Sequence, residues 1–79
     1  MKDEIGNMNY RKLLYFFENK KAVHFVKTDG IWQNGMIEDL NEKKLTLVLN
    51  EFKQGMTPIL LEDIDTDSIS LYKIGGEKK

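Results

Sequence analysis

The sequence predicts a mainly β fold, in which one N-terminal helix precedes five short antiparallel strands that bend strongly into a small barrel. Three observations support this prediction. Apolar residues recur with helical spacing before residue 22, alternating and β-branched residues dominate after it, and an Asp-Gly pair is followed by a glycine inside the next strand. We expect one domain, with the helix at residues 9–21, the barrel at residues 22–73 and a flexible tail at residues 74–79.

An apolar stripe near the N-terminus predicts the helix. Asn9 precedes the stripe and can cap the first turn, because its side-chain oxygen can accept from a backbone amide that lacks an intrahelical partner. Lys20 and Lys21 follow at the end, where the helix dipole favours cations. We therefore expect the helix to begin near Asn9. The members of the stripe lie on one helical face at i, i+3, i+4 and i+7: Tyr10, Leu13, Leu14 and Phe17.

A β-hairpin is the strongest local signal. The first strand is predicted at residues 22–28 and the second at residues 31–40, because both are rich in β-branched and aromatic residues. Asp29-Gly30 separates them and is a favoured hairpin turn, since glycine adopts positive φ without strain. Gly35 inside the second strand indicates a bulge or a sharp bend, as small barrels need where a strand turns a corner.

Three further strands complete the predicted barrel. Residues 45–49 contain enough branched aliphatic residues for a strand buried on both faces. Pro58 has no amide proton, so it belongs at the start or exposed edge of a strand at residues 57–61. The last strand is predicted at residues 69–72, where apolar and polar residues alternate.

The size of the chain predicts that it self-associates. A chain of 79 residues buries a small core, and with no cysteine and a single histidine it lacks disulfides and thiolate zinc sites as supplements. Oligomerisation is the remaining common supplement. The two edge strands, near residues 57–61 and 69–72, are apolar and lack lysine, so we expect them to pair with identical copies in a closed homo-oligomeric ring. With no leader or long apolar run, we expect a soluble cytoplasmic protein without a membrane segment.

Charge is distributed unevenly along the chain. The net charge of −1 lacks the strong basic excess typical of nucleic-acid binders. Residues 9–28 are nevertheless mainly basic, whereas residues 56–72 carry only acidic charges. These charges are either ordinary solvated surface or two faces that meet different partners.

The hairpin and the third strand together resemble the Sm and Sm-like (LSm) family, whose first motif combines these elements. The resemblance spans residues 9–73 and implies an SH3-type barrel, assembly into a ring and binding of single-stranded RNA without a cofactor. The family places Arg-Gly after its fourth strand, whereas this chain has Glu62-Asp63. The matching residues are Val23, Phe25, Asp29-Gly30, Gly35, Ile37 and Leu47-Val48-Leu49.

The resemblance also implies where RNA would bind. Asn41, Lys43 and Lys44 lie in the turn between the second and third strands, where Sm-like proteins gather RNA-contacting residues. Arg11 and Lys12 on the helix are additional candidates for phosphate contact. An ordinary lysine-rich turn is the simpler interpretation of Lys43 and Lys44.

Aromatic residues offer a second kind of candidate site. His24 faces opposite to Val23 and Phe25 in the first strand, so it is either structural or a proton carrier or stacking partner. Trp32 and Tyr15 are either core residues or exposed platforms on which unpaired bases stack.

No motif indicates catalysis or a metal. His24 has no neighbouring nucleophile, and neither a phosphate-binding loop nor a dinucleotide fingerprint occurs, so we expect no enzyme. Asp63, Asp65 and Asp67 imitate the start of a calcium loop, but the required later glycine and glutamate are missing. The alternative to an RNA-binding ring is a structural or protein-interaction ring, in which the acidic residues 62–67 meet a basic partner.

Overall fold

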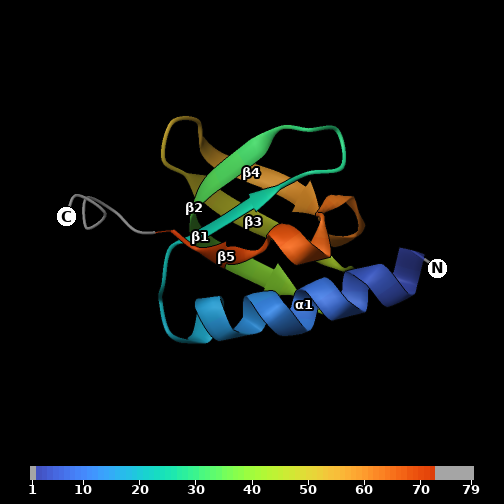
Figure 1. The fold of residues 1–79 in the computed structure, drawn as a ribbon. Helices are drawn as coiled ribbons and strands as arrows, with labels where there is room; N and C mark the ends of the chain where they lie inside the picture. Colours follow the sequence, from blue (N-terminus) through green and yellow to red (C-terminus); the bar gives the residue numbers. More distant parts are fainter. Residues whose placement is uncertain (1, 73–79) are drawn as a thin grey trace.

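A computed structural model of the chain describes residues 2–72 and consists of one helix and one antiparallel sheet (Figure 1). The strand order in the sheet is β4-β3-β2-β1-β5, so β4 and β5 lie at its two ends and the sheet is not closed. The mainly β prediction is confirmed, whereas the predicted tail at residues 74–79 lies outside the described residues. The elements are α1 (Lys2–Glu18), β1 (Val23–Val26), β2 (Trp32–Asn41), β3 (Thr46–Glu51), β4 (Gly55–Leu60) and β5 (Ser70–Leu71).

The helix begins earlier than its apolar stripe predicts. α1 starts at Lys2, so the prediction of an N-cap at Asn9 is wrong, and Asn9 is instead fully buried within the helix. Gly6 does not interrupt α1, because it lies where α1 approaches Leu45: a Cβ there would come within 2.9 Å of Leu45 Cδ1. The helical turns before Asn9 are therefore stabilised by packing that a local pattern does not reveal.

The C-terminal end of α1 also differs from the prediction. The helix ends at Glu18, and not at Lys21, because Lys20 adopts a left-handed conformation with φ of 55°. The amide of Lys20 donates to the carbonyl of Phe17 (3.4 Å) and that of Lys21 to the carbonyl of Phe16 (3.0 Å). These bonds form a Schellman motif, which satisfies helix-terminal carbonyls and turns the chain toward β1.

The predicted hairpin is confirmed. β1 pairs antiparallel with β2, and Gly30 adopts a positive φ of 90° in the turn between them. Asp29 stabilises this turn, since its Oδ1 accepts from the amide of Ile31 (3.0 Å). Both strands stop short of the turn, so β1 is shorter than the predicted residues 22–28.

Gly35 has a different role from the one predicted. The irregularity in β2 falls between Ile37 and Asp39, where the register with β3 shifts. At Gly35 the backbone of β3 approaches so closely that an added Cβ would overlap the carbonyl oxygen of Asn50 and lie 2.9 Å from its carbonyl carbon. Glycine is required here by this contact between strands and not by a bulge.

β3, β4 and the segment that follows β4 each differ from the prediction. β3 alternates between buried and exposed side chains, so it is buried on one face and not on two. β4 begins at Gly55, two residues before its predicted start, and Pro58 lies within it. Between β4 and β5 the chain forms two short 3-10 helices, η1 (Leu61–Asp63) and η2 (Thr66–Ser68), where no helix was predicted.

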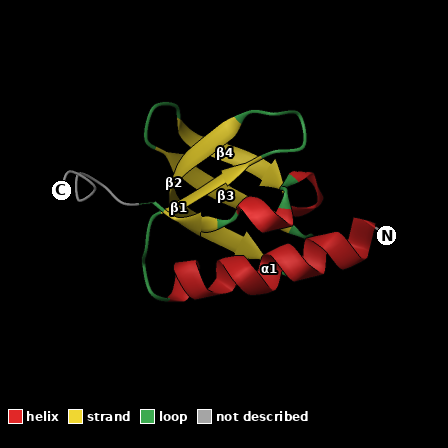
Figure 2. Cartoon of the chain, in the orientation of Figure 1, coloured by secondary structure: helices red, strands yellow, loops and turns green. Residues whose placement is uncertain are grey.

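The core lies between the inner face of the sheet, α1 and η1. Figure 2 shows α1 running along one side of the sheet beside the 3-10 turns. Asn9 joins these elements: its Nδ2 donates to the carbonyls of Leu61 (2.6 Å) and Ile64 (2.9 Å). No α-helix within residues 2–72 has the length and apolar composition needed to span a membrane. The buried core residues are Leu13, Val23, Phe25, Ile37, Leu47, Leu49, Ile59, Leu61 and Ile64.

Candidate functional site

The polar turn between β2 and β3 carries three of the predicted RNA-contacting residues. Asn41 lies at its start, and its Oδ1 accepts from the amide of Lys44 (2.8 Å). The side chains of Lys43 and Lys44 are exposed. The turn lies beside η1, because the amide of Leu61 donates to the carbonyl of Leu45 (2.9 Å). Asn41 therefore shapes the turn, while the two lysines project from it into solvent.

The two predicted residues of the helix form a separate group. Arg11 and Lys12 are exposed on α1, and Lys12 Nζ donates to the carbonyl of Thr66 in η2 (3.1 Å). No hydrogen bond or ion pair within residues 4–72 joins this group to the β2–β3 turn. Lys12 therefore already makes one hydrogen bond, to the backbone of η2.

A row of four aromatic side chains lies on the outer face of the sheet. The rings of His24 in β1 and Trp32 in β2 stack with centroids 4.4 Å apart and an angle of 11° between their planes. Tyr72, which follows β5, lies 6.2 Å from His24, and Phe52 in the β3–β4 turn lies 5.4 Å from Tyr72. Trp32 and Phe52 remain about half exposed, at 51% and 47%. We call these four residues the aromatic row.

Asn34 fixes the orientation of His24 in this row. The two residues are opposite each other in the β1–β2 pair, and Nδ1 of His24 forms a hydrogen bond with Oδ1 of Asn34. Because an amide oxygen can only accept, Nδ1 of His24 is the donor in this hydrogen bond. The backbone carbonyl of Asn34 accepts from the amide of Phe52 (2.9 Å), so Asn34 also positions the far end of the row.

A buried glutamate supports the turn that carries Phe52. The carboxylate of Glu51 accepts hydrogen bonds from the amides of Asn34 (3.3 Å), Lys53 (2.8 Å) and Gln54 (2.9 Å). Burial by itself raises the pKa of Glu51, but these bonds and the charge of Lys53 outweigh it and hold the pKa below its ordinary value. Glu51 is therefore an ionised structural group and not a proton donor at neutral pH.

The aromatic row was only partly predictable. Alternation in the first strand placed His24 opposite to Val23 and Phe25. Trp32 and Tyr15 were left as either core or exposed residues, and the structure shows both exposed, at 51% and 54%. Tyr15 lies on α1 and packs edge-on against Phe16. Phe52 and Tyr72 were missed, because only the register of the sheet brings them beside His24.

Comparisons with known proteins assign neither a family nor a function to the chain. No family model matches the chain, and neither the curated proteins nor the solved structures include a significant match. Among the described residues, no three histidine, cysteine, aspartate or glutamate side chains gather as ligands for a metal ion. The geometry of the sheet and of its outer face is therefore the basis for the function proposed below.

Proposed function

We propose that the chain is an Sm-like subunit that assembles through β4 and β5 into a closed ring of identical copies, and that this ring binds single-stranded RNA. The observation that supports assembly is the position of β4 and β5 at opposite ends of one antiparallel sheet. A strand at each end can pair with the next copy head to tail, and such heterologous contacts close into a ring when the rotation allows. The register shift in β2 between Ile37 and Asp39 supports the small-barrel form of the subunit, since such irregularities bend a strand.

The edge of β4 has unpaired backbone groups at alternate residues. The amide of Leu61 donates to Leu45, and the β3–β4 register continues from that pair, so Thr57 and Ile59 bond to β3. Met56, Pro58 and Leu60 therefore direct their backbone groups outward. Proline has no amide, so the edge offers donors only at Met56 and Leu60. Their side chains are 62% and 48% exposed, which favours pairing with another strand over contact with water.

The edge of β5 complements that of β4. The amide of Tyr72 donates to the carbonyl of Ala22 (3.1 Å), and Val23 is opposite Leu71. By the same alternation, the amide and carbonyl of Leu71 point away from β1. The Leu71 side chain is 46% exposed. A neighbouring β4 can satisfy both groups of Leu71 through Met56 or Leu60, but only one of them through Pro58.

RNA binding is supported by the aromatic row. Unpaired bases stack on exposed aromatic side chains regardless of sequence, and each such stack contributes about 1–3 kcal/mol. Trp32 offers half of its surface for this purpose, with His24 behind it as a fixed partner. Lys43 and Lys44 provide exposed cations for phosphates, repeated once per subunit around the ring. The net charge of −1 per chain means that stacking and not charge dominates the affinity.

The assembly proposal is tested by placing a charge on the β4 edge. Leu60→Lys introduces a lysine that opposes pairing with another strand. Light scattering behind a sizing column should give a multiple of 9.2 kDa for the parent chain and a smaller species for the variant. Ile31→Lys is the matched control, because Ile31 is similarly exposed (51%) but lies in the β1–β2 turn. A parent chain of 9.2 kDa at micromolar concentration refutes the ring.

The RNA proposal is tested by fluorescence anisotropy with labelled oligo-U and oligo-A at about 50 mM salt, where backbone contacts are strong. Trp32→Ala should weaken binding about tenfold, whereas Tyr15→Ala should change it less than about twofold, since only Trp32 belongs to the proposed platform. Lys43→Glu with Lys44→Glu should also weaken binding and reduce its salt dependence. Absence of binding at micromolar protein, or equal effects of the two aromatic substitutions, rejects RNA stacking on this face.

A further inference from the structure

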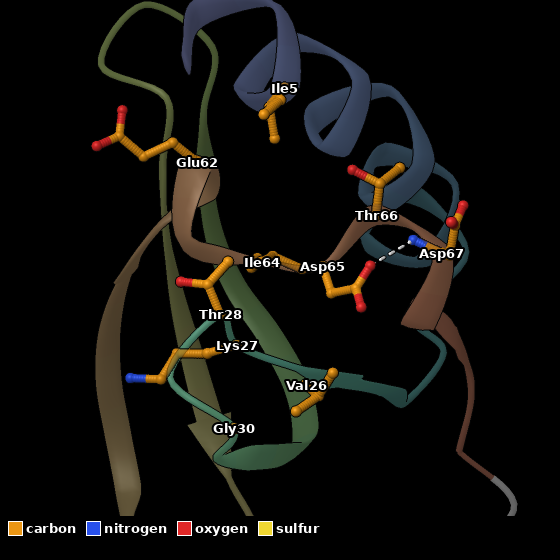
Figure 3. A pocket seen from close by; sticks show the side chains of 10 residues that line it. All are labelled: Ile5, Val26, Lys27, Thr28, Gly30, Glu62, Ile64, Asp65, Thr66 and Asp67. Atoms are coloured by element: carbon orange, nitrogen blue, oxygen red, sulfur yellow. Dashed lines mark hydrogen bonds between the residues drawn. The ribbon is translucent and has the colours of Figure 1, made fainter. Parts of the chain in front are cut away.

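A depression of about 610 Å³ lies between α1, the end of β1 and residues 62–67 (Figure 3). We propose that this depression is a docking site for a basic segment of another protein that inserts one apolar side chain between lysine or arginine residues. The proposal goes beyond RNA binding and does not depend on it. It rests on how the walls are built, on the apolar lining and on the charge of the rim.

The walls of the depression are fixed by backbone pairing. The amide of Thr28 donates to the carbonyl of Asp63 (2.7 Å), and the amide of Asp65 donates to the carbonyl of Val26 (3.0 Å). These bonds flank an isolated β-bridge between Lys27 and Ile64. Asn9 holds α1 against the same segment through its bond to the Ile64 carbonyl. The depression is thus preformed, so a ligand need not order it on binding.

The lining is suited to one aliphatic side chain. Ile5 from α1 and Val26 from β1 contribute apolar surface, and the side chain of Ile64 in the η1–η2 connection is buried beneath them. Ile5 extends from α1 over the depression in Figure 3 and is 42% exposed, although it is large and apolar. The volume lies within the range of about 300–1,000 Å³ that is usual for ligand sites. A leucine or similar side chain would cover surface that is otherwise left in water.

The rim is acidic, although the ammonium group of Lys12 donates to the carbonyl of Thr66 beside it (3.1 Å). Asp65 and Asp67 line the depression, and no ion pair to either carboxylate occurs within residues 4–72. The amide of Asp67 donates to Oδ1 of Asp65 (3.1 Å), which fixes the position of the Asp65 carboxylate (Figure 3). Lys27, the one basic residue in the lining, pairs with Asp29 instead (3.8 Å). Complementarity therefore favours a ligand with positive charges on both sides of its apolar anchor.

The direct test uses the full chain in its assembled state, labelled at isoleucine methyl groups. The probe is the pentapeptide Lys-Lys-Leu-Lys-Lys, with Lys-Lys-Ser-Lys-Lys and Glu-Glu-Leu-Glu-Glu as controls. The leucine-containing basic peptide should shift the methyl signals of Ile5, the isoleucine of the lining whose side chain is exposed. The buried methyls of Ile37 and Ile59, which do not line the depression, should stay within error and serve as internal references. Equal shifts with the serine peptide overturn the apolar anchor, and absence of shifts overturns the site.

A charge variant separates this site from general attraction of a basic peptide. Asp65→Asn with Asp67→Asn removes two charges but keeps an oxygen that can accept the Asp67 amide, so η2 should persist. Binding of the basic peptide should weaken about fivefold, in line with two exposed charge contacts. Asp39→Asn is the matched control, because Asp39 is exposed on β2 and does not line the depression. An equal loss with Asp39→Asn overturns the proposal, as does displacement of the peptide by oligo-U, which would mean one shared site.

Discussion

The two faces of the β1–β2 hairpin differ in how deeply their side chains are buried. On the inner face, Val23 and Phe25 are fully buried and Ile37 nearly so. On the outer face, one residue away along the same strands, Trp32 is 51% exposed and His24 and Asn34 are half-buried. Because side chains alternate along a strand, one segment supplies both the core and a candidate binding surface. Substitutions facing inward should therefore change folding, and those facing outward should change binding.

The largest effect is expected where β2 meets the backbone of β3. Gly35→Ala places a methyl group against the carbonyl of Asn50, and a neighbouring backbone cannot rotate away as a side chain can. Separating the strands would break pairs on both sides, so we expect a loss of about 4 kcal/mol in the free energy of unfolding. Urea denaturation followed by circular dichroism measures it.

Gly30→Ala is the control for Gly35→Ala, since it makes the same chemical change in the same hairpin. Gly30 has a positive φ of 90° but no neighbouring atom within 4 Å of an added Cβ. Only backbone strain opposes alanine there, at about 1–2 kcal/mol. If Gly35→Ala proves no worse than Gly30→Ala, the close approach of β2 and β3 does not hold the inner face.

The same contrast explains which features the sequence could predict. Asp29-Gly30 was identified correctly, because the conformation of a tight turn is set by the residues within it. Asn9 was misassigned as a helix cap, because its hydrogen-bond partners, Leu61 and Ile64, are more than 50 positions away in the chain. The local capping rule correctly indicated that the Asn9 side chain bonds to the backbone, but it could not distinguish a helix cap from a buried contact between distant segments.

The candidate site shows the same limit. His24 could be placed opposite to Val23 and Phe25 from alternation alone, whereas Trp32 could not be assigned to the core or to the surface. Phe52 and Tyr72 join them only because the strand order puts β5 beside β1, and because the β3–β4 turn bonds to Asn34. The depression was missed altogether, since η1 and η2 are too short to leave a periodic pattern and their position depends on pairing with the end of β1.

Asn9 connects α1, the helix that packs beside the sheet, to the segment that follows β4. Asn9→Ala removes two buried hydrogen bonds; the Leu61 carbonyl keeps the amide of Ile64 as a donor (3.2 Å), whereas the Ile64 carbonyl loses its bond to Asn9, which should lower the free energy of unfolding by about 2–3 kcal/mol. Thermal unfolding by calorimetry measures this loss.

Asn19→Ala is the matched control for Asn9→Ala. The Nδ2 of Asn19 also donates to a carbonyl, that of Tyr15 (2.8 Å), but at an exposed helix end where water can replace it. We expect a change below about 1 kcal/mol. Similar losses for both asparagines would show that the Asn9 bonds stabilise α1 no more than an exposed bond does, and that other packing attaches the helix to η1.

The smallest effect is expected at Glu51, which connects the two faces: it is opposite Gly35 in β3, and its carboxylate accepts from the amide of Asn34 on the outer face. Its lowered pKa means that folding favours the ionised form, so this contribution to stability is complete above the ordinary pKa of 4.5 and is lost as the pH falls through the folded-state pKa. Glu51→Gln should remove about 1 kcal/mol at pH 7, because an amide oxygen is a weaker acceptor than a carboxylate. The difference in stability between parent and variant, measured by urea denaturation, should shrink as the pH is lowered below 4.5.

Asp39→Asn, a change at an exposed carboxylate of β2, is the control and should leave the pH dependence unaltered. A difference that stays constant from pH 7 to below the folded-state pKa would mean that Glu51 acts through its shape and not through its charge.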